Sequence, residues 1–216
     1  MTLAEGTKLF IEQAKLTPWL EWLAIVAGIA EVLLARANKV LLYPAGILST
    51  VIYTWLFLRP TTRLYADAIL NVYYFVMSIY GWILWKQNKD GHQLQISRSS
   101  PKDWRITVVF SIGGWGLLYL LLTQVFPRLF SFYVVSDVAA WDALISSTAW
   151  VGMWLLARRK IENWILLNIS NLIAIPVYVY KGMPFTAGLT LFLLIVAIFG
   201  YFEWVKQYRY NLQSSN

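Results

Sequence analysis

The segment AIFGYFEW at residues 197–204 matches SIYGWILW at residues 78–85, with a glycine and a tryptophan in register at an offset of 119. The tetrapeptide LLAR also occurs twice, at 33–36 and at 155–158, at an offset of 122. Matched tryptophans and a matched tetrapeptide are more specific than a general likeness between apolar segments. We therefore expect two copies of one structural unit in this chain.

A further set of matches extends the duplication but needs another offset. Asn38 falls on Asn163, and Tyr53 falls on Tyr178, when the two halves are shifted by 125 residues. The changing offset predicts two small insertions and one later deletion between the copies.

The composition places the chain among integral membrane proteins. Of its 216 residues, 59% are hydrophobic and 13% are charged, whereas a soluble domain has about 25% charged residues. Such a chain cannot cover itself with a hydrated surface. Seven apolar runs are long enough to cross a bilayer as helices: 20–37, 40–58, 64–85, 106–126, 138–157, 161–180 and 186–204.

These runs predict an all-α integral membrane protein with seven transmembrane helices. Two parallel three-helix repeats, 20–85 and 138–204, are joined by a linker helix at 106–126. Three spans per repeat plus one linker make both repeats point the same way, which is a design of transporters that hold substrate between the repeats. The remaining parts are an N-terminal surface segment at 1–19, a cytoplasmic loop at 86–105 and a cytoplasmic tail at 205–216.

The distribution of positive charge predicts the topology. Six of the 18 Lys and Arg residues fall on the side that contains the N-terminus, and twelve fall on the opposite side. Cytoplasmic loops carry the excess of basic residues, so we expect the N-terminus outside and the C-terminus in the cytoplasm. Because the basic residues are scattered at the ends of apolar runs, the net charge of +7 indicates membrane topology and not nucleic-acid binding.

Polar side chains form a stripe along one face of three predicted helices. The stripes are Trp164, Asn168, Asn171 and Tyr178; Asp67, Asn71, Tyr74 and Ser78; and Asp142, Ser146 and Met153. Such stripes face protein or water, because an unpaired amide in an apolar medium costs about 2–7 kcal/mol. They indicate either hydrogen bonds that hold helices together or a cavity whose indole and amides suit a flat ligand.

The cavity is our working hypothesis for the stripes. Glu31 is expected to pair with Arg36 or Lys39 near the cytoplasmic end, and a role as ligand counter-ion is the alternative. The candidate substrate-binding residues are Trp164, Asn168, Asn171, Asn71, Tyr74, Asp67, Tyr178 and Met153.

The chain lacks the residues of several other functional classes. Cysteine is absent and the single histidine, His92, lies in a polar loop, so we expect no metal and no cofactor. Neither His-Glu-x-x-His nor Gly-x-Ser-x-Gly occurs, which argues against an enzyme. A retinal protein would need a lysine in the last span, and 186–204 contains none. A structural membrane subunit or a small channel stays an alternative.

Three regions carry a resemblance to a known family. They are EWLAIVAGIAEVLLARANKVLLYPAGI at 21–47, YADAILNVYYFVMSIYGWILW at 65–85, and VGMWLLARRKIENW with NLIAIPVYVYKG within 151–182. These regions resemble the PnuC family of bacterial nicotinamide riboside transporters, over most of residues 20–207. That family is similar in fold to the SWEET sugar transporters, with three helices, a linker helix and three more.

The resemblance implies a vitamin transporter of the inner membrane. Nicotinamide riboside, a nucleoside with a cationic ring, would enter by facilitated diffusion and be trapped through phosphorylation by a cytoplasmic kinase, and the carrier would be a homotrimer. The family pattern on the sixth helix is Asn-Trp-x-x-Trp with a polar residue four positions on. Asn163, Trp164 and Asn171 match this pattern, and Leu167 replaces the second tryptophan. Thiamine and riboflavin are the alternative substrates, since relatives look like carriers of these vitamins.

Overall fold

The structure is a computed structural model that describes residues 3–59, 65–89 and 92–214. The described part is helical apart from one short antiparallel strand pair. Its elements are α1 (Leu3–Leu16), α2 (Trp19–Arg36), α3 (Leu42–Leu58), α4 (Tyr65–Lys86), β1 (Asn88–Lys89), β2 (His92–Gln93), α5 (Pro101–Leu120), the π-helical turn η1 (Leu121–Val125), α6 (Phe126–Leu129), α7 (Ala139–Ala157), α8 (Asn163–Tyr180) and α9 (Pro184–Ser214).

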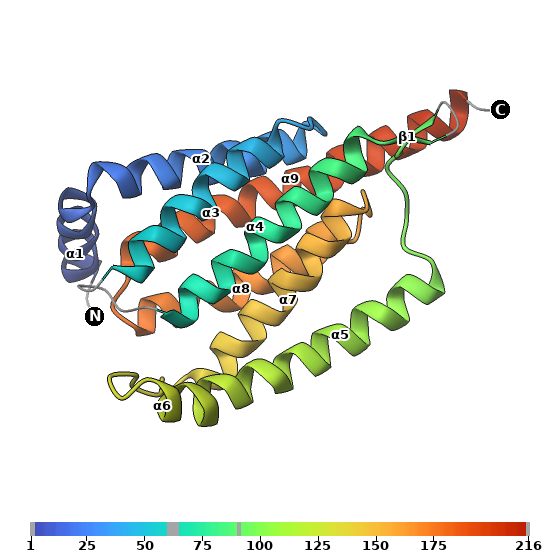
Figure 1. Cartoon of the computed structure of the whole chain (residues 1–216). Coiled ribbons are helices and arrows are strands. Elements are labelled where there is room, and N and C mark those ends of the chain that lie inside the picture. The colour runs from blue at the N-terminus through green and yellow to red at the C-terminus, as the bar shows by residue number, and fades with distance from the viewer. Residues whose placement is uncertain (1–2, 60–64, 90–91, 215–216) are drawn as a thin grey trace.

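Six helices pack side by side in a closed ring. Within each predicted repeat the helices pack in chain order, α2 on α3 on α4, and α7 on α8 on α9. The ring closes where α4 meets α7 and where α9 meets α2 (Figure 1). The predicted linker α5 lies outside the ring against α7, and α1 lies against α9. The arrangement is the one expected of two like units around a common axis.

Equivalent side chains make equivalent hydrogen bonds in the two halves. The Ser49 hydroxyl donates to the carbonyl oxygen of Ala24 at 2.9 Å, and the Ser170 hydroxyl donates to that of Ile145 at 2.9 Å. Both members of the second pair lie 121 residues after those of the first. These bonds join the first and second helix of each half, so they support the predicted duplication.

Two tryptophans tie each half to the other. The Trp85 indole N–H donates to the carbonyl oxygen of Ala157 at 3.1 Å, and the Trp204 indole N–H donates to that of Ala35 at 2.9 Å. All four residues are at most 3% exposed. Trp85 and Trp204 are the tryptophans that the two matching octapeptides set in register.

The first helix of each half ends in the same tight turn. Asn38 and Arg159 are the two described non-glycine residues with positive φ, at 54° and 51°. In both turns the next N–H bonds the carbonyl five residues earlier at 2.9 Å, which is how a left-handed residue closes a helix end. Asparagine adopts this conformation readily, whereas arginine does so at a cost of roughly 1–2 kcal/mol.

The turns correct one detail of the predicted repeat. Asn38 is equivalent to Arg159 and not to Asn163, because the structural offset here is 121. The same offset separates Tyr53 from Tyr178, so that pairing was also wrong. Identical residue types had matched by chance one helical turn away from the true register.

The membrane-crossing helices are only partly defined by length and hydropathy. Within the described residues, four stretches qualify alone: Ala68–Lys86, Pro101–Leu129, Asn163–Tyr180 and Pro184–Gln213. Helices α1 and α2 qualify together, with a bend of 107° between them, and α3 is apolar but shorter. The polar stripe lowers the hydropathy of α7. The number of seven spans therefore stays a prediction.

Helix ends differ from the predicted boundaries in two places. Helix α5 begins at Pro101 and not at 106, because Ser100 and Asp103 cap it reciprocally: each side chain accepts from the other backbone N–H, at 3.1 and 2.9 Å. Helix α9 continues to Ser214, where an irregular tail was expected from 205, and its end extends beyond the other helices (Figure 1). The predicted third span begins at 64, which lies outside the described residues.

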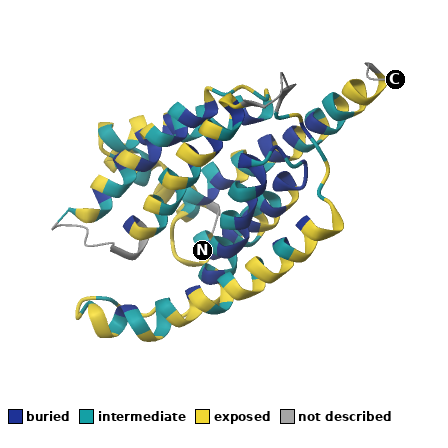
Figure 2. Ribbon diagram, turned by 45° about the vertical axis from the view of Figure 1, so that its right-hand side comes forward, coloured by how far each residue is buried: buried dark blue, intermediate teal, exposed yellow. Residues whose placement is uncertain are grey.

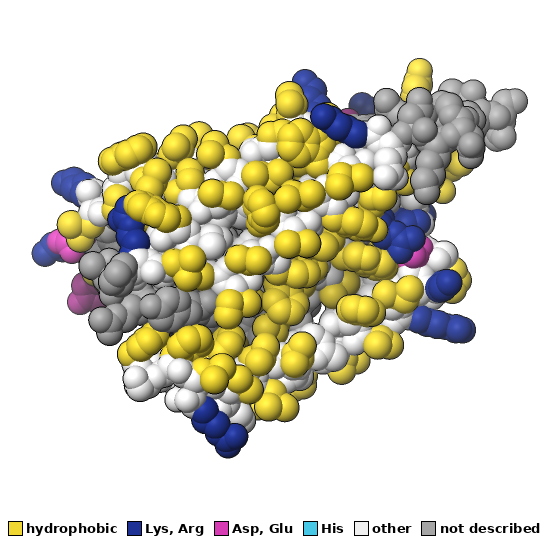
Figure 3. Space-filling model, viewed as in Figure 1, with side chains coloured by type: hydrophobic (Ala, Val, Ile, Leu, Met, Phe, Trp, Pro, Cys, Tyr) yellow, Lys and Arg dark blue, Asp and Glu magenta, His cyan; other side chains and the backbone are white. Residues whose placement is uncertain are grey.

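The outer surface suits a lipid environment. Exposed side chains run along most of α5, whereas buried residues concentrate between the ring helices (Figure 2). Hydrophobic side chains cover the middle of the visible face, and charged ones lie toward its edges (Figure 3). We call one edge of the bundle the basic end, where these residues gather: Arg36, Lys39, Lys86, Arg98, Arg158, Arg159 and Lys160.

Candidate functional site

The polar stripe of α8 faces the inside of the ring. Asn168, Asn171 and Tyr178 are half-buried. The opposite face of the same helix carries the exposed side chains of Ile169 and Leu172, which are 42% and 62% exposed. A helix that sorts its residues in this way presents its amides to protein and its aliphatic side chains to lipid.

The stripe of α4 faces inward in the same way. Asn71 and Tyr74 are half-buried and Ser78 is fully buried, whereas Val72 and Val76 on the outer face are 47% and 54% exposed. Asp67 belongs to the same helix, but its side chain lies outside the described residues. Helices α4 and α8 belong to different halves, so two polar stripes face the same interior.

Asn168 presents a buried polar atom without a hydrogen-bond partner among the described residues. Its Oδ1 is inaccessible and accepts no hydrogen bond there. Leaving one buried acceptor unsatisfied costs about 1–3 kcal/mol. An amide that only joined helices would have its partner in place. Asn168 is therefore the residue of the predicted set that fits a ligand donor best.

Glu31 corrects one expectation. Its side chain lies against α3, where a Cβ at Gly46 would be 2.5 Å from Oε1. No described residue forms an ion pair within 4.0 Å of Glu31, and the Arg36 guanidinium lies instead over the Phe199 ring at 5.3 Å. The predicted pairing of Glu31 with Arg36 or Lys39 is wrong, because Glu31 faces α3 while Arg36 faces α9.

Three helices bring ionisable side chains together inside the ring. Glu31 of α2 lies close enough to Tyr74 of α4 for a direct electrostatic interaction, and Tyr178 of α8 does as well. Glu31 also interacts with Tyr43 of α3. We call Glu31, Tyr74 and Tyr178 the central cluster. It combines one carboxylate with two aromatic rings contributed by both halves.

Trp164 has a different environment from the one predicted. Its indole is 0% exposed and packs edge-on against Trp204, with ring centroids 5.7 Å apart. The ring also covers Gly200, where an added Cβ would be 2.8 Å away. In this conformation Trp164 offers no free face for stacking, and its role in binding stays a prediction. The equivalent residue Tyr43 covers Gly81 in the other half.

The other residues of the family pattern and the third stripe lie apart from the central cluster. Asn163 is fully buried and donates to the Lys160 carbonyl at 2.6 Å, so it holds the turn before α8. Leu167 packs against Gly152. Met153 packs against the aromatic core around Trp164. Asp142 forms an ion pair with Lys181 at 2.7 Å, at the end opposite to the basic end.

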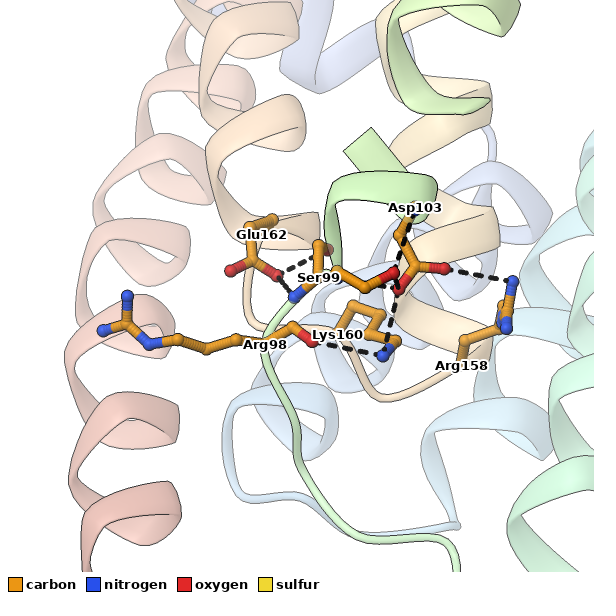
Figure 4. A network of polar contacts seen from close by, with 7 residues as sticks. Arg98, Ser99, Asp103, Arg158, Lys160 and Glu162 are labelled. Atoms are coloured by element: carbon orange, nitrogen blue, oxygen red, sulfur yellow. Dashed lines mark hydrogen bonds and ion pairs between the residues drawn. The ribbon is translucent and has the colours of Figure 1, made fainter. Parts of the chain in front are cut away.

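Sequence reasoning missed a polar network at the basic end (Figure 4). The Ser99 N–H and hydroxyl both donate to Glu162 Oε2, at 2.7 and 2.6 Å. Asp103 forms ion pairs with Lys160 at 3.3 Å and with Arg158 at 3.5 Å. The network fastens the segment before α5 to the turn between α7 and α8. Its residues are far apart in sequence, and only the capping box Ser-x-x-Asp was recognisable in advance.

A closed helix ring with an apolar exterior and polar stripes inside defines the chain as a membrane transporter of small molecules. Residues 18–206 match the profile of the nicotinamide mononucleotide transporter family. The chain belongs to this family, and the resemblance seen in its sequence is confirmed. Since the family and the relatives below are transporters, the expectation that the chain is not an enzyme is confirmed as well.

Individual relatives agree with this assignment. The chain is 25% identical over 212 residues to the nicotinamide riboside transporter PnuC of Escherichia coli (strain K12), covering 88% of this chain and 87% of that protein. It is 23% identical over 198 residues to the nicotinamide riboside transporter PnuC of Neisseria mucosa, covering 87% and 72%. The crystal structure of the vitamin B3 transporter PnuC has the same fold, with a TM-score of 0.66 at 20% identity over 96% of this chain and 92% of that one.

Proposed function

We propose that this chain imports nicotinamide riboside across the bacterial inner membrane by facilitated diffusion, with the N-terminus outside and the C-terminus in the cytoplasm. The substrate is trapped after entry through phosphorylation by a cytoplasmic kinase. The proposal is supported by family membership and by relatives that are named nicotinamide riboside transporters. The carrier works as a homotrimer, as the family resemblance implies.

The observation that carries the choice of substrate is the charge inside the ring. The sequence contains no Lys or Arg within 19–35, 42–58, 65–85, 139–157, 163–180 or 184–205. The same stretches contain acidic residues, among them Glu31. A phosphate group binds where arginine, lysine or a helix N-terminus faces it. The interior therefore favours a cationic nucleoside over its phosphorylated form.

The proposed binding residues come from both halves. Asn168, Asn171 and Asn71 read the carboxamide and the ribose hydroxyls, and Tyr74 and Tyr178 supply aromatic contacts. Asp67 adds negative charge to the path. Trp164 and Met153 complete the predicted set and support the site from the aromatic core.

Uptake into proteoliposomes tests the function. We expect saturable entry of labelled nicotinamide riboside that follows only its own gradient, with further accumulation when a riboside kinase and ATP are enclosed. Excess nicotinamide mononucleotide should not compete. Loss of uptake after dissipation of a proton or sodium gradient, in vesicles without kinase, would contradict facilitated diffusion. Competition by thiamine or riboflavin at lower concentration than by nicotinamide riboside would establish one of these vitamins as the substrate instead.

A further inference from the structure

Glu31 lies on the inward face of α2 at some depth. The exposed residues Trp22, Val26 and Leu33 occupy the opposite face of the helix, at 39%, 59% and 41% exposure. Glu31 is five residues before Arg36, which places it roughly 7.5 Å from the basic end along the helix axis. A carboxylate in this position is surrounded by protein and not by the aqueous phase.

The surrounding helices leave room for this carboxylate but supply no cation. Gly46 is the residue of α3 that faces it, and any larger side chain there would collide with the carboxylate. Among the described residues Glu31 accepts no hydrogen bond and has no ion-pair partner, although three basic residues stand one turn or more away at the end of the helix. An acidic residue inside a membrane protein normally pairs with a basic group or marks a substrate path.

The duplication shows that packing does not require this acid. Glu31 is equivalent to Gly152 at the structural offset of 121, and Gly46 is equivalent to Leu167. In the second half, Leu167 packs against Gly152, so the large and small residues have exchanged helices and the large one is aliphatic. The fold therefore fills this contact with a hydrocarbon side chain in one half and with a carboxylate in the other.

Aromatic side chains lie around the carboxylate. Tyr74 and Tyr43 interact with it electrostatically, and Tyr178 of the second half lies beside Tyr74. A carboxylate next to aromatic rings is the environment that stabilises an organic cation, because the ring faces and the carboxylate both attract positive charge.

We propose that Glu31 is the counter-ion for the positively charged ring of the substrate and makes the carrier selective for cationic over neutral rings. The inference rests on the proposed function, and it assigns to one residue the recognition of charge. The amides of the stripes then recognise shape and hydrogen bonds, which cationic and neutral forms of the nucleoside share.

The test compares two ligands that differ in ring charge. Nicotinamide riboside carries a pyridinium, and its reduced form, dihydronicotinamide riboside, carries a neutral ring of nearly the same shape. Binding of each is measured calorimetrically on the purified full chain in detergent. We expect Glu31→Gln to weaken binding of nicotinamide riboside at least tenfold while changing binding of the reduced form less than twofold. Glu31→Asp, which keeps the charge, should retain most of the preference for the cation.

A matched control is Glu21→Gln on the same helix, which should leave both affinities unchanged. Equal losses for both ligands in Glu31→Gln, or no loss for either, would overturn the counter-ion while leaving the proposed function in place. A wild-type chain that binds neither ligand would overturn the proposed function, and the counter-ion with it. Thermal unfolding without ligand shows that each variant is folded before the comparison is made.

Discussion

At the scale of single residues, the two halves use one device with different rings. Trp164 covers Gly200, and Tyr43 covers Gly81, so that in each half a ring from the second helix lies on a glycine of the third. Both rings are at most 1% exposed. The glycine of each matching octapeptide is thus explained by close packing, since helix and ring approach without a Cβ between them.

Gly200→Ala should destabilise the protein. The added Cβ would be 2.8 Å from the Trp164 ring, and overpacking of this kind costs about 1–3 kcal/mol. Thermal unfolding in detergent should show a lower melting temperature. The control is Gly116→Ala on α5, where an added Cβ meets nothing within 4 Å, and where alanine should leave stability equal or slightly higher. Equal melting temperatures for the two variants would contradict the packing role of Gly200.

Asn168→Leu separates a binding residue from one that joins helices. Asn168 Oδ1 has no partner among the described residues, so leucine should keep or raise the melting temperature while it weakens binding of nicotinamide riboside. The comparison variant is Asn163→Leu, because the Asn163 amide donates to Lys160 at 2.6 Å and its loss should cost about 1–3 kcal/mol. A stability loss in Asn168→Leu as large as that in Asn163→Leu would assign Asn168 to helix contacts.

The sequence was informative about these residues only where periodicity acts. The inward stripes of α4 and α8 follow from helical spacing, so their direction could be read in advance. The neighbours of Glu31 and Trp164 could not, because they come from other helices: Gly46 and Phe199 lie far from the residues they decide. The absence of a ring at Leu167 was visible, but its contact with Gly152 was not.

At the scale of elements, the segment before α5 is fastened to the turn between α7 and α8. The Ser97 N–H donates to the Arg159 carbonyl at 3.0 Å, and the Ile161 N–H donates to the Ser97 carbonyl at 3.0 Å. Ser99 and Glu162 add the side-chain bonds described above. The linker helix is thereby held to the second half at its start, and α5 also packs along α7.

Glu162→Gln should loosen this attachment. Both Ser99 donors bind one carboxylate oxygen, and hydrogen bonds to a charged group contribute about 1.5–3 kcal/mol each, so a neutral amide should weaken them. We expect a lower melting temperature and faster proteolytic cleavage of the segment 94–100. The control is Glu203→Gln on α9, whose carboxylate accepts only a longer bond of 3.2 Å from Gln207. Unchanged cleavage in Glu162→Gln would mean that the backbone bonds of Ser97 suffice.

Element boundaries were predicted less well than elements. A hydropathy window finds the apolar part of α5 but ignores the polar cap, so the start at Pro101 was missed although Ser100 and Asp103 carry a recognisable signature. Helix α9 continues past its apolar part because polar residues such as Gln207 favour helices as well. Hydropathy measures burial in lipid, and helix ends obey capping instead.

At the scale of the whole molecule, the duplication was predicted from a few tryptophans and glycines, and the ring of helices supports it. The register was partly wrong because insertions were inferred from chance matches of asparagine and tyrosine. The closure of the ring between α4 and α7 and between α9 and α2 was beyond the sequence, since it depends on how whole helices pack.

The predicted topology can be measured directly, because the chain has no cysteine of its own. Gln87 lies exposed at the basic end, and Leu129, which is 67% exposed, lies at the far end of the linker. Single cysteines at these two positions should react with a membrane-impermeant maleimide from opposite sides, Leu129→Cys from outside intact cells. Labelling of both from one side would contradict the topology and the parallel repeats with it.

The reciprocal tryptophan bonds have a consequence for turnover. Trp85 and Trp204 bind carbonyls of the opposite half at the basic end, and the rings of Tyr43 and Trp164 belong to the same buried aromatic core. The bundle is thus corked on one side, and its stopper is built symmetrically from both halves. A solute that has entered from the far side can leave only when the halves rock apart and these indoles let go together. Discharge into the cell, and not capture, would then be the slow stroke of the cycle.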